Sequence, residues 1–163
     1  VVANLAATAQ DALAVEVEEG YDAVIAGVGA PKDANLYQTT RGATYVILGA
    51  HNPLRAGGRL VTPARLTEGA GEGTGEQRCY EWLSTADSAD ALYEKMREGY
   101  EPGAQRAFVV AQALRDHEVW VTDSEAPGVV EDCLRSAADS VEAAIEPGSE
   151  VLVVPDALNT LLV

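Results

Sequence analysis

Three side chains suited to binding a carboxylate lie close together in the first third of the chain. Arg41 follows Tyr37 by four residues and Gln38 by three, so on a helix neighbouring positions would bring these side chains together. The guanidinium of an arginine donates hydrogen bonds in a planar fork, and an amide beside it completes a reasonable carboxylate clamp. The residue types and their spacing therefore predict a site for a small anion that carries a carboxylate group.

The preceding residues predict how this site is positioned. Residues 23–26 are a short apolar run that is long enough for a buried strand. Gly27 and Gly29 then allow a tight turn, and Asp33 is suited to cap the helix that follows. A strand, a glycine turn and a helix place the turn at the carboxyl edge of a parallel sheet, where open α/β proteins bind ligands. The start of the helix would also present free N–H groups to an anion.

A longer motif runs through this segment. Its residues are, in chain order, Gly29, Pro31, Asp33, Asn35, Tyr37, Gln38 and Arg41. In these residues the segment resembles the C-terminal half of the nickel-dependent lactate racemase family, which has a glycine pair, Pro-x-Asp-x-Asn and Tyr-Gln-x-x-Lys at this point. Two positions differ, because Val28 replaces one glycine of the pair and Arg41 replaces the lysine. Arginine keeps the positive charge without the point geometry of an ammonium, so the resemblance leaves the substrate open.

The resemblance implies a function for the chain. It implies the substrate-closing C-terminal domain of a longer, two-domain enzyme that racemises or epimerises a 2-hydroxy acid by hydride transfer through a nickel-pincer nucleotide. The nucleotide and the catalytic histidines would belong to the missing N-terminal domain, so this domain alone would bind no cofactor or metal and would be inactive. The substrate-binding residues that it implies are Tyr37, Gln38, Arg41, Gly29, Asp33, Asn35, Glu68 and Gly71.

Two further segments enter through the same resemblance. Residues 67–75 are glycine-rich, and by composition alone they predict a solvated loop. The family has a similar loop with an acidic residue facing the cleft between its domains, which is why Glu68 and Gly71 are included above. Residues 103–106, which end in Arg106, resemble a Gly-x-x-Lys of the family at the start of a helix.

Other chemistries are disfavoured by the motifs. The turn begins like a dinucleotide-binding fingerprint, but Lys32 stands where the third glycine should be, and neither glycine loop contains the Gly-Lys-Ser/Thr of a P-loop. His51 and His117 are far apart, and we expect surface or helix-end positions for both. Cys79 and Cys133 have no second cysteine or histidine nearby in sequence, which predicts free thiols in a reducing compartment.

Length and charge limit the possible partners. The 163 residues predict a single domain, and the formal charge of −15 argues against binding to nucleic acid or to an anionic membrane surface. No apolar run long enough to span a membrane and no secretory signal are visible, so we expect a cytoplasmic protein. The chain begins with Val1 and a segment that reads as a helix, so we expect a fragment of a longer protein.

Alternating elements predict an α/β fold with three layers: a short, mostly parallel sheet with helices on both faces. The predicted strands are residues 21–26, 59–62, 119–121 and 151–154. The predicted helices are residues 2–17, 33–49, 76–83, 88–98, 103–115, 129–134 and 136–145.

Two functions of other classes stay open at this point. One is a stand-alone module that binds a small carboxylate or phosphate at residues 27–41. The other is a structural domain whose site has decayed, which the changes at Val28 and Arg41 would suggest. The second would be favoured if replacing Gln38 and Arg41 by alanine left the activity of a full-length enzyme intact.

Overall fold

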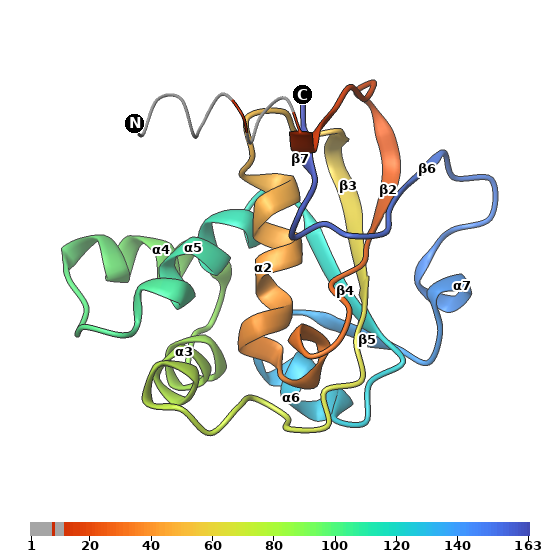
Figure 1. Cartoon of the computed structure of the whole chain (residues 1–163). Coiled ribbons are helices and arrows are strands. Elements are labelled where there is room, and N and C mark those ends of the chain that lie inside the picture. Colours follow the sequence, from red (N-terminus) through yellow and green to blue (C-terminus); the bar gives the residue numbers. More distant parts are fainter. Residues whose placement is uncertain (1–7, 9–11) are drawn as a thin grey trace.

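Parallel strands form the centre of the molecule (Figure 1). The structure is a computed structural model that describes residue 8 and residues 12–163. Within this described part, five strands form one sheet in the order β5-β4-β3-β2-β6, and all neighbours are parallel. They are β2 (Tyr21–Ala26), β3 (Leu54–Pro63), β4 (Glu118–Thr122), β5 (Ser136–Ala138) and β6 (Val151–Val154). The predicted α/β fold with a mostly parallel sheet is confirmed.

The connections between the strands contain the helices. In chain order these are η1 (Lys32–Ala34), α2 (Leu36–Ile47), α3 (Thr74–Ser84), α4 (Ala89–Glu98), α5 (Gln105–Leu114), α6 (Pro127–Asp132) and α7 (Val141–Ala144). The helix predicted to continue to about residue 49 is α2, although its last turn is rich in residues that favour strands. Burial of Val46 and Ile47 against the sheet outweighs that local preference.

A second, two-stranded sheet corrects one prediction. Residues 2–17 were predicted to be helical, but β1 (Ala14–Val15) pairs in parallel with β7 (Leu161–Leu162). The amide N–H of Val17 also donates to the carbonyl oxygen of Val163, at 3.1 Å. Alanine favours a helix locally, and pairing with a strand from the other end of the chain overrides it. Residue 8 and residues 12–13 are helical, as predicted, and residues 2–7 and 9–11 of the predicted helix lie outside the described residues.

Two other element boundaries differ from prediction. The helix predicted at 136–145 is divided into β5, which extends the sheet beside β4, and the short helix α7, which is capped by Ser140. Strand β3 begins at Leu54 rather than at residue 59 because an irregularity lets the chain rejoin the sheet. Gly57, with a positive φ of 71°, lies within this irregularity.

The two faces of the sheet are covered unequally. Helices α2 and α5 pack on one face, where Val24, Leu60 and Val119 form a core with Ala43 and Ala113. Further from the sheet, α3 and α4 pack against α5 (Figure 1).

The opposite face is covered over only part of its width. Arg59 stacks on Trp120, 4.5 Å from the ring centroid, and donates to the carbonyl oxygen of Ala144 in α7, at 2.6 Å. At the β6 edge, Val153 remains 56% exposed. None of the helices in the described part of the chain is long and apolar enough to cross a membrane.

Candidate functional site

The turn after β2 places the start of α2 at the carboxyl edge of the sheet. Gly29 has a positive φ of 60°, and its carbonyl oxygen accepts from the amides of Lys32 and Asp33, at 2.9 and 3.1 Å. The sequence predicted that Asp33 caps this helix, and that prediction is wrong. Asp33 belongs to the short helix η1 and does not cap α2. The cap is Asn35, whose extended backbone lets its Oδ1 accept from the amide of Gln38, at 3.0 Å.

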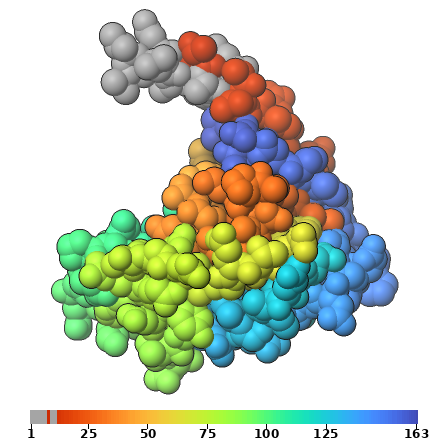
Figure 2. All heavy atoms as spheres, turned by 60° about the horizontal axis from the view of Figure 1, so that its bottom comes forward, coloured from red at the N-terminus to blue at the C-terminus, as the bar shows by residue number. Residues whose placement is uncertain are grey.

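Asn35 also joins this turn to the glycine-rich loop after β3. Its Nδ2 donates to Glu68 Oε2 at 3.0 Å and to Glu76 Oε1 at 3.4 Å. Backbone hydrogen bonds connect Leu36 with Gly69 and Glu68 with Ala34 across the same contact. Figure 2 looks onto this end of the molecule and shows the orange start of α2 beside the yellow-green loop.

Gly71 is required in that loop for a conformational reason. Its φ is 99°, and a Cβ atom there would be closer than 3.0 Å to the carboxylate of Glu76. Its carbonyl oxygen accepts from the side-chain amide of Gln77. The loop predicted from composition to be solvated is thus held by specific contacts, which bring Glu68 to Asn35 and Gly71 to Glu76 and Gln77.

We predict that Asn35→Ala lowers the free energy of unfolding by about 2 kcal/mol, near the upper end for the loss of an N-cap. Asn35 is only 5% exposed, and its replacement removes both the cap and the contact with Glu68. Ser88→Ala is the matched control, because Ser88 caps the exposed start of α4 in the same way. Urea unfolding monitored by tryptophan fluorescence measures both. An equal loss in the two variants would contradict the role of Asn35 as a joint between the loops.

Two polar atoms on the first turns of α2 are buried without a partner. They are Gln38 Oε1 and Arg41 Nε, and neither has a hydrogen bond within the described part of the chain. Buried polar atoms are satisfied in most native structures, so such a pair indicates that something else supplies the missing partners. Tyr37 lies beside them and packs against the core under α3 and α5.

Arg106 in α5 reaches the same side of α2. Its Nη1 donates to Thr44 Oγ1 at 3.1 Å, and its guanidinium carbon lies 5.9 Å from the centroid of the Tyr37 ring. Arg106 was not among the predicted substrate-binding residues. Its only signal in the sequence was the resemblance at residues 103–106, because residues so distant in the chain meet only in the tertiary structure.

The arginines of the domain differ in whether they pair with a carboxylate. Five arginines pair with carboxylates, namely Arg55, Arg59, Arg65, Arg97 and Arg115. Among the described residues, four arginines form no ion pair with a carboxylate, and Arg41 and Arg106 are two of them; the others are Arg78 and Arg135. Two cations that lack carboxylate partners on the sides of one helix can serve an external anion.

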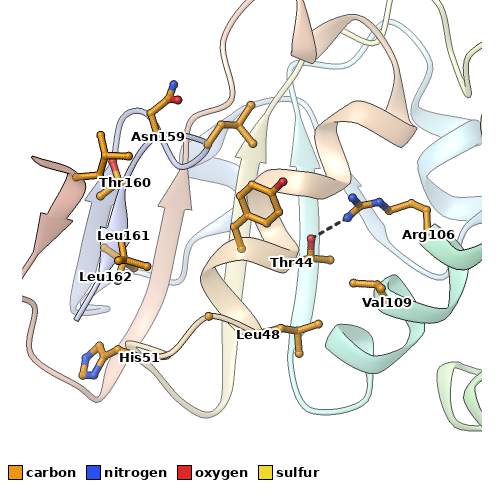
Figure 3. Close-up of a pocket in the computed structure, with 13 residues that line it drawn as sticks. Thr44, Leu48, His51, Arg106, Val109, Asn159, Thr160, Leu161 and Leu162 are labelled. Carbon is orange, nitrogen blue, oxygen red and sulfur yellow. Dashed lines mark hydrogen bonds between the residues drawn. The ribbon is translucent and has the colours of Figure 1, made fainter. Parts of the chain in front are cut away.

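A groove follows α2 from this surface toward the end of the helix (Figure 3). It has a volume of about 750 Å³. Thr44 and Arg106 lie at its polar side, where the hydrogen bond between them is drawn in Figure 3. The other residues that line it are Leu13, Tyr45, Leu48, Gly49, His51, Val109, Leu158, Asn159, Thr160, Leu161 and Leu162. We call this set of residues the α2 groove.

Comparison with known protein families shows the family to which this domain belongs. A model of the lactate racemase C-terminal domain family matches residues 16–161. The chain belongs to this family. A search of the curated proteins finds no match.

Two solved structures have the same fold as this lactate racemase C-terminal domain. The lactate racemase apoprotein from Thermoanaerobacterium thermosaccharolyticum matches with a TM-score of 0.79 and 22% identity, over 96% of this chain and 39% of that one. A Thermotoga maritima protein of known crystal structure matches with a TM-score of 0.60 and 9% identity, over 93% of this chain and 39% of that one. The domain therefore spans about two fifths of the length of either protein.

The two cysteines of the domain are buried free thiols, as predicted. Burial raises the pKa of Cys79 to about 12 and also raises that of Cys133. Arg135 lies near them at 7% exposure, and burial lowers the pKa of its guanidinium. Its Nη1 donates to the carbonyl oxygen of Cys133 at 3.2 Å. High thiol pKa values make these cysteines poor nucleophiles.

Both histidines were expected at surface or helix-end positions, and His117 differs from this expectation. His117 is 9% exposed, and its ring nitrogens lie 3.0 Å from Asn52 Nδ2 and 3.2 Å from the carbonyl oxygen of Gly58, so it belongs to the interior. Its position before β4 hides it, a consequence of packing that the sequence did not reveal. His51 lies in the α2 groove, with Nδ1 3.6 Å from Glu19. Across residues 8 and 12–163, no three His, Cys, Asp or Glu side chains are grouped so that they could hold a metal ion.

Proposed function

We propose that this chain is the substrate-closing domain of an enzyme that racemises or epimerises a 2-hydroxy acid. The observation that carries the proposal is the pair of buried, unpartnered atoms Gln38 Oε1 and Arg41 Nε. They lie at positions of the motif shared with the lactate racemase family, on a helix start at the carboxyl edge of the sheet. A substrate carboxylate and hydroxyl would supply the acceptor and donor that these two atoms lack.

Each residue has a distinct part in the proposed site. Arg41 binds the carboxylate through its guanidinium and neutralises its charge. Gln38 Oε1 accepts from the substrate hydroxyl, which orients the α-carbon away from α2. Tyr37 forms the wall between Gln38 and Arg106 and excludes water from the bound acid. Asn35 and Glu68 hold the helix start and the loop in place through the hydrogen bonds described above.

The cofactor of the proposed enzyme lies outside this chain. A nickel-pincer nucleotide would supply acceptance and return of a hydride at the α-carbon, and a preceding domain would hold it. The side chains described here do not form a metal-ligand set, so no chemical step is assigned to them. Their contribution is to bind the acid, fix its orientation and close over it.

Titration of the ¹⁵N-labelled chain with L-lactate tests the binding part of the proposal. We expect the largest changes in chemical shift at the amides of Tyr37, Gln38 and Arg41. The full-length polypeptide, loaded with the nucleotide, should convert one enantiomer of a 2-hydroxy acid into a mixture. Binding without turnover by the loaded protein would instead identify an anion-binding module. Absence of binding at α2 would overturn the proposal and favour a structural domain.

A further inference from the structure

We infer that the substrate is a 2-hydroxy acid with a bulky apolar substituent, and that the α2 groove holds this substituent. A branched alkyl or aryl group has the required chemistry. The inference rests on the proposed function, because it takes the carboxylate to be bound by Gln38 and Arg41. It adds the chemical class of the substrate, which the motif residues leave open.

The α2 groove begins one helical turn beyond the proposed carboxylate site. Thr44 and Tyr45, which line the groove, follow Arg41 by three and four residues and are therefore its neighbours on the helix surface. Arg106 connects the two regions physically, because it lines the groove while its guanidinium lies over the Tyr37 ring. From Arg41 to Leu48 the helix rises only about 10 Å, so a substituent a few carbons long reaches into the groove.

The size of the groove argues for a large substituent. Its volume of about 750 Å³ lies within the range of pockets that hold complete small molecules. A methyl group, as in lactate, would leave nearly all of it empty. Substituents with several carbons would instead remove water from the surfaces of Leu48 and Val109, and burial of apolar surface is favourable.

The lining argues for an apolar substituent rather than a second acid group. Leucine, valine and tyrosine side chains form most of the wall, among them Leu158, Leu161 and Leu162. Arg106 is the arginine of the lining, and it already donates to Thr44 Oγ1. The other polar side chains of the lining, Thr44, His51, Asn159 and Thr160, are outnumbered by the apolar ones and tyrosine, so a second carboxylate would lose more hydration there than an alkyl group would.

The first test compares three acids on the complete 163-residue chain: 2-hydroxy-4-methylpentanoate, lactate and malate. We expect the branched acid to bind at least roughly tenfold more tightly than lactate, because three additional carbons are buried. Its titration should also perturb the amides of Thr44, Tyr45 and Leu48. Equal affinity for the branched acid and lactate would overturn the inference and leave the proposed function standing. Tighter binding of malate than of the branched acid would also overturn it and assign a second anion site to Arg106.

Variants separate the groove from the carboxylate site. Leu48→Asn places an amide in the groove. It should therefore reduce the preference for the branched acid, measured as its affinity divided by the affinity for lactate, at least roughly fivefold. Leu48 is 36% exposed, so the change has little effect on the core, and Val109→Thr provides a second variant of the same wall. Val153→Asn is the matched control, because Val153 is an exposed apolar residue on the opposite face of the sheet. An unchanged ratio in both groove variants would refute the inference, whereas failure of every acid to bind at α2 would refute the proposed function itself.

Discussion

In the proposed full-length 2-hydroxy acid racemase or epimerase, Arg41→Gln should lower kcat/KM by at least about 100-fold, since breaking a buried charge pair typically costs about 2–5 kcal/mol. The stability of the domain should change little, because Arg41 makes no ion pair within the described residues and its Nε has no hydrogen bond to lose. The same variant of the isolated chain should no longer show the lactate-dependent shifts at α2.

Two further variants define what Arg41 contributes. Arg97→Gln is the charge-matched control, because Arg97 is exposed on α4 and pairs there with Glu94; its kcat/KM should equal that of the unchanged enzyme. Arg41→Lys retains the charge but not the fork, so we expect partial activity. If Arg41→Gln retained activity within about threefold of the parent, Arg41 would not bind the carboxylate.

Gly27→Ala is expected to destabilise the domain by about 3 kcal/mol, the upper part of the usual range for overpacking. A Cβ atom at position 27 would be closer than 3.0 Å to the carbonyl oxygen of Pro155. Pro155 cannot move away easily, because the residues on either side of it are bonded to Gly27. The amide of Gly27 donates to the carbonyl oxygen of Val154, and the carbonyl oxygen of Gly27 accepts from the amide of Ala157, each at 2.9 Å. These bonds hold β2 and the end of β6 together where the strand order reverses, so overpacking there is not relieved by a loop movement.

Gly128→Ala provides the control for this substitution. No atom of the described residues lies within 4 Å of a Cβ atom at Gly128, which is in the first turn of α6. Its free energy of unfolding should stay equal or rise by about 0.4–1 kcal/mol, because alanine has fewer unfolded conformations. Urea unfolding of both variants measures the difference. Equal stability of the two would show that the contact between Gly27 and Pro155 is not a structural constraint.

Local patterns in the sequence were sufficient for the elements around the site. The apolar run at 23–26, the glycines after it and the spacing of Tyr37, Gln38 and Arg41 each report on a few adjacent residues. Strand β2, the turn and helix α2 followed from them, because a buried strand and a helix with one apolar face have distinct periods. The family resemblance depended on the same short segment.

Tertiary structure decided what depends on contacts between distant segments. The identity of the cap at Asn35 followed from the formation of η1, and the split of residues 136–145 followed from the need to extend the sheet beside β4. Strand β1 formed from an alanine-rich segment because β7 was available to pair with it.

The site shows the same division. The residue types of the proposed carboxylate site could be chosen from the sequence by itself, since Tyr37, Gln38 and Arg41 are neighbours on one helix. Only the fold brought Glu68 to Asn35, placed Arg106 beside Thr44 and opened the α2 groove next to them. Those contacts join residues at least 33 positions apart, and no local period in a sequence encodes such a distance.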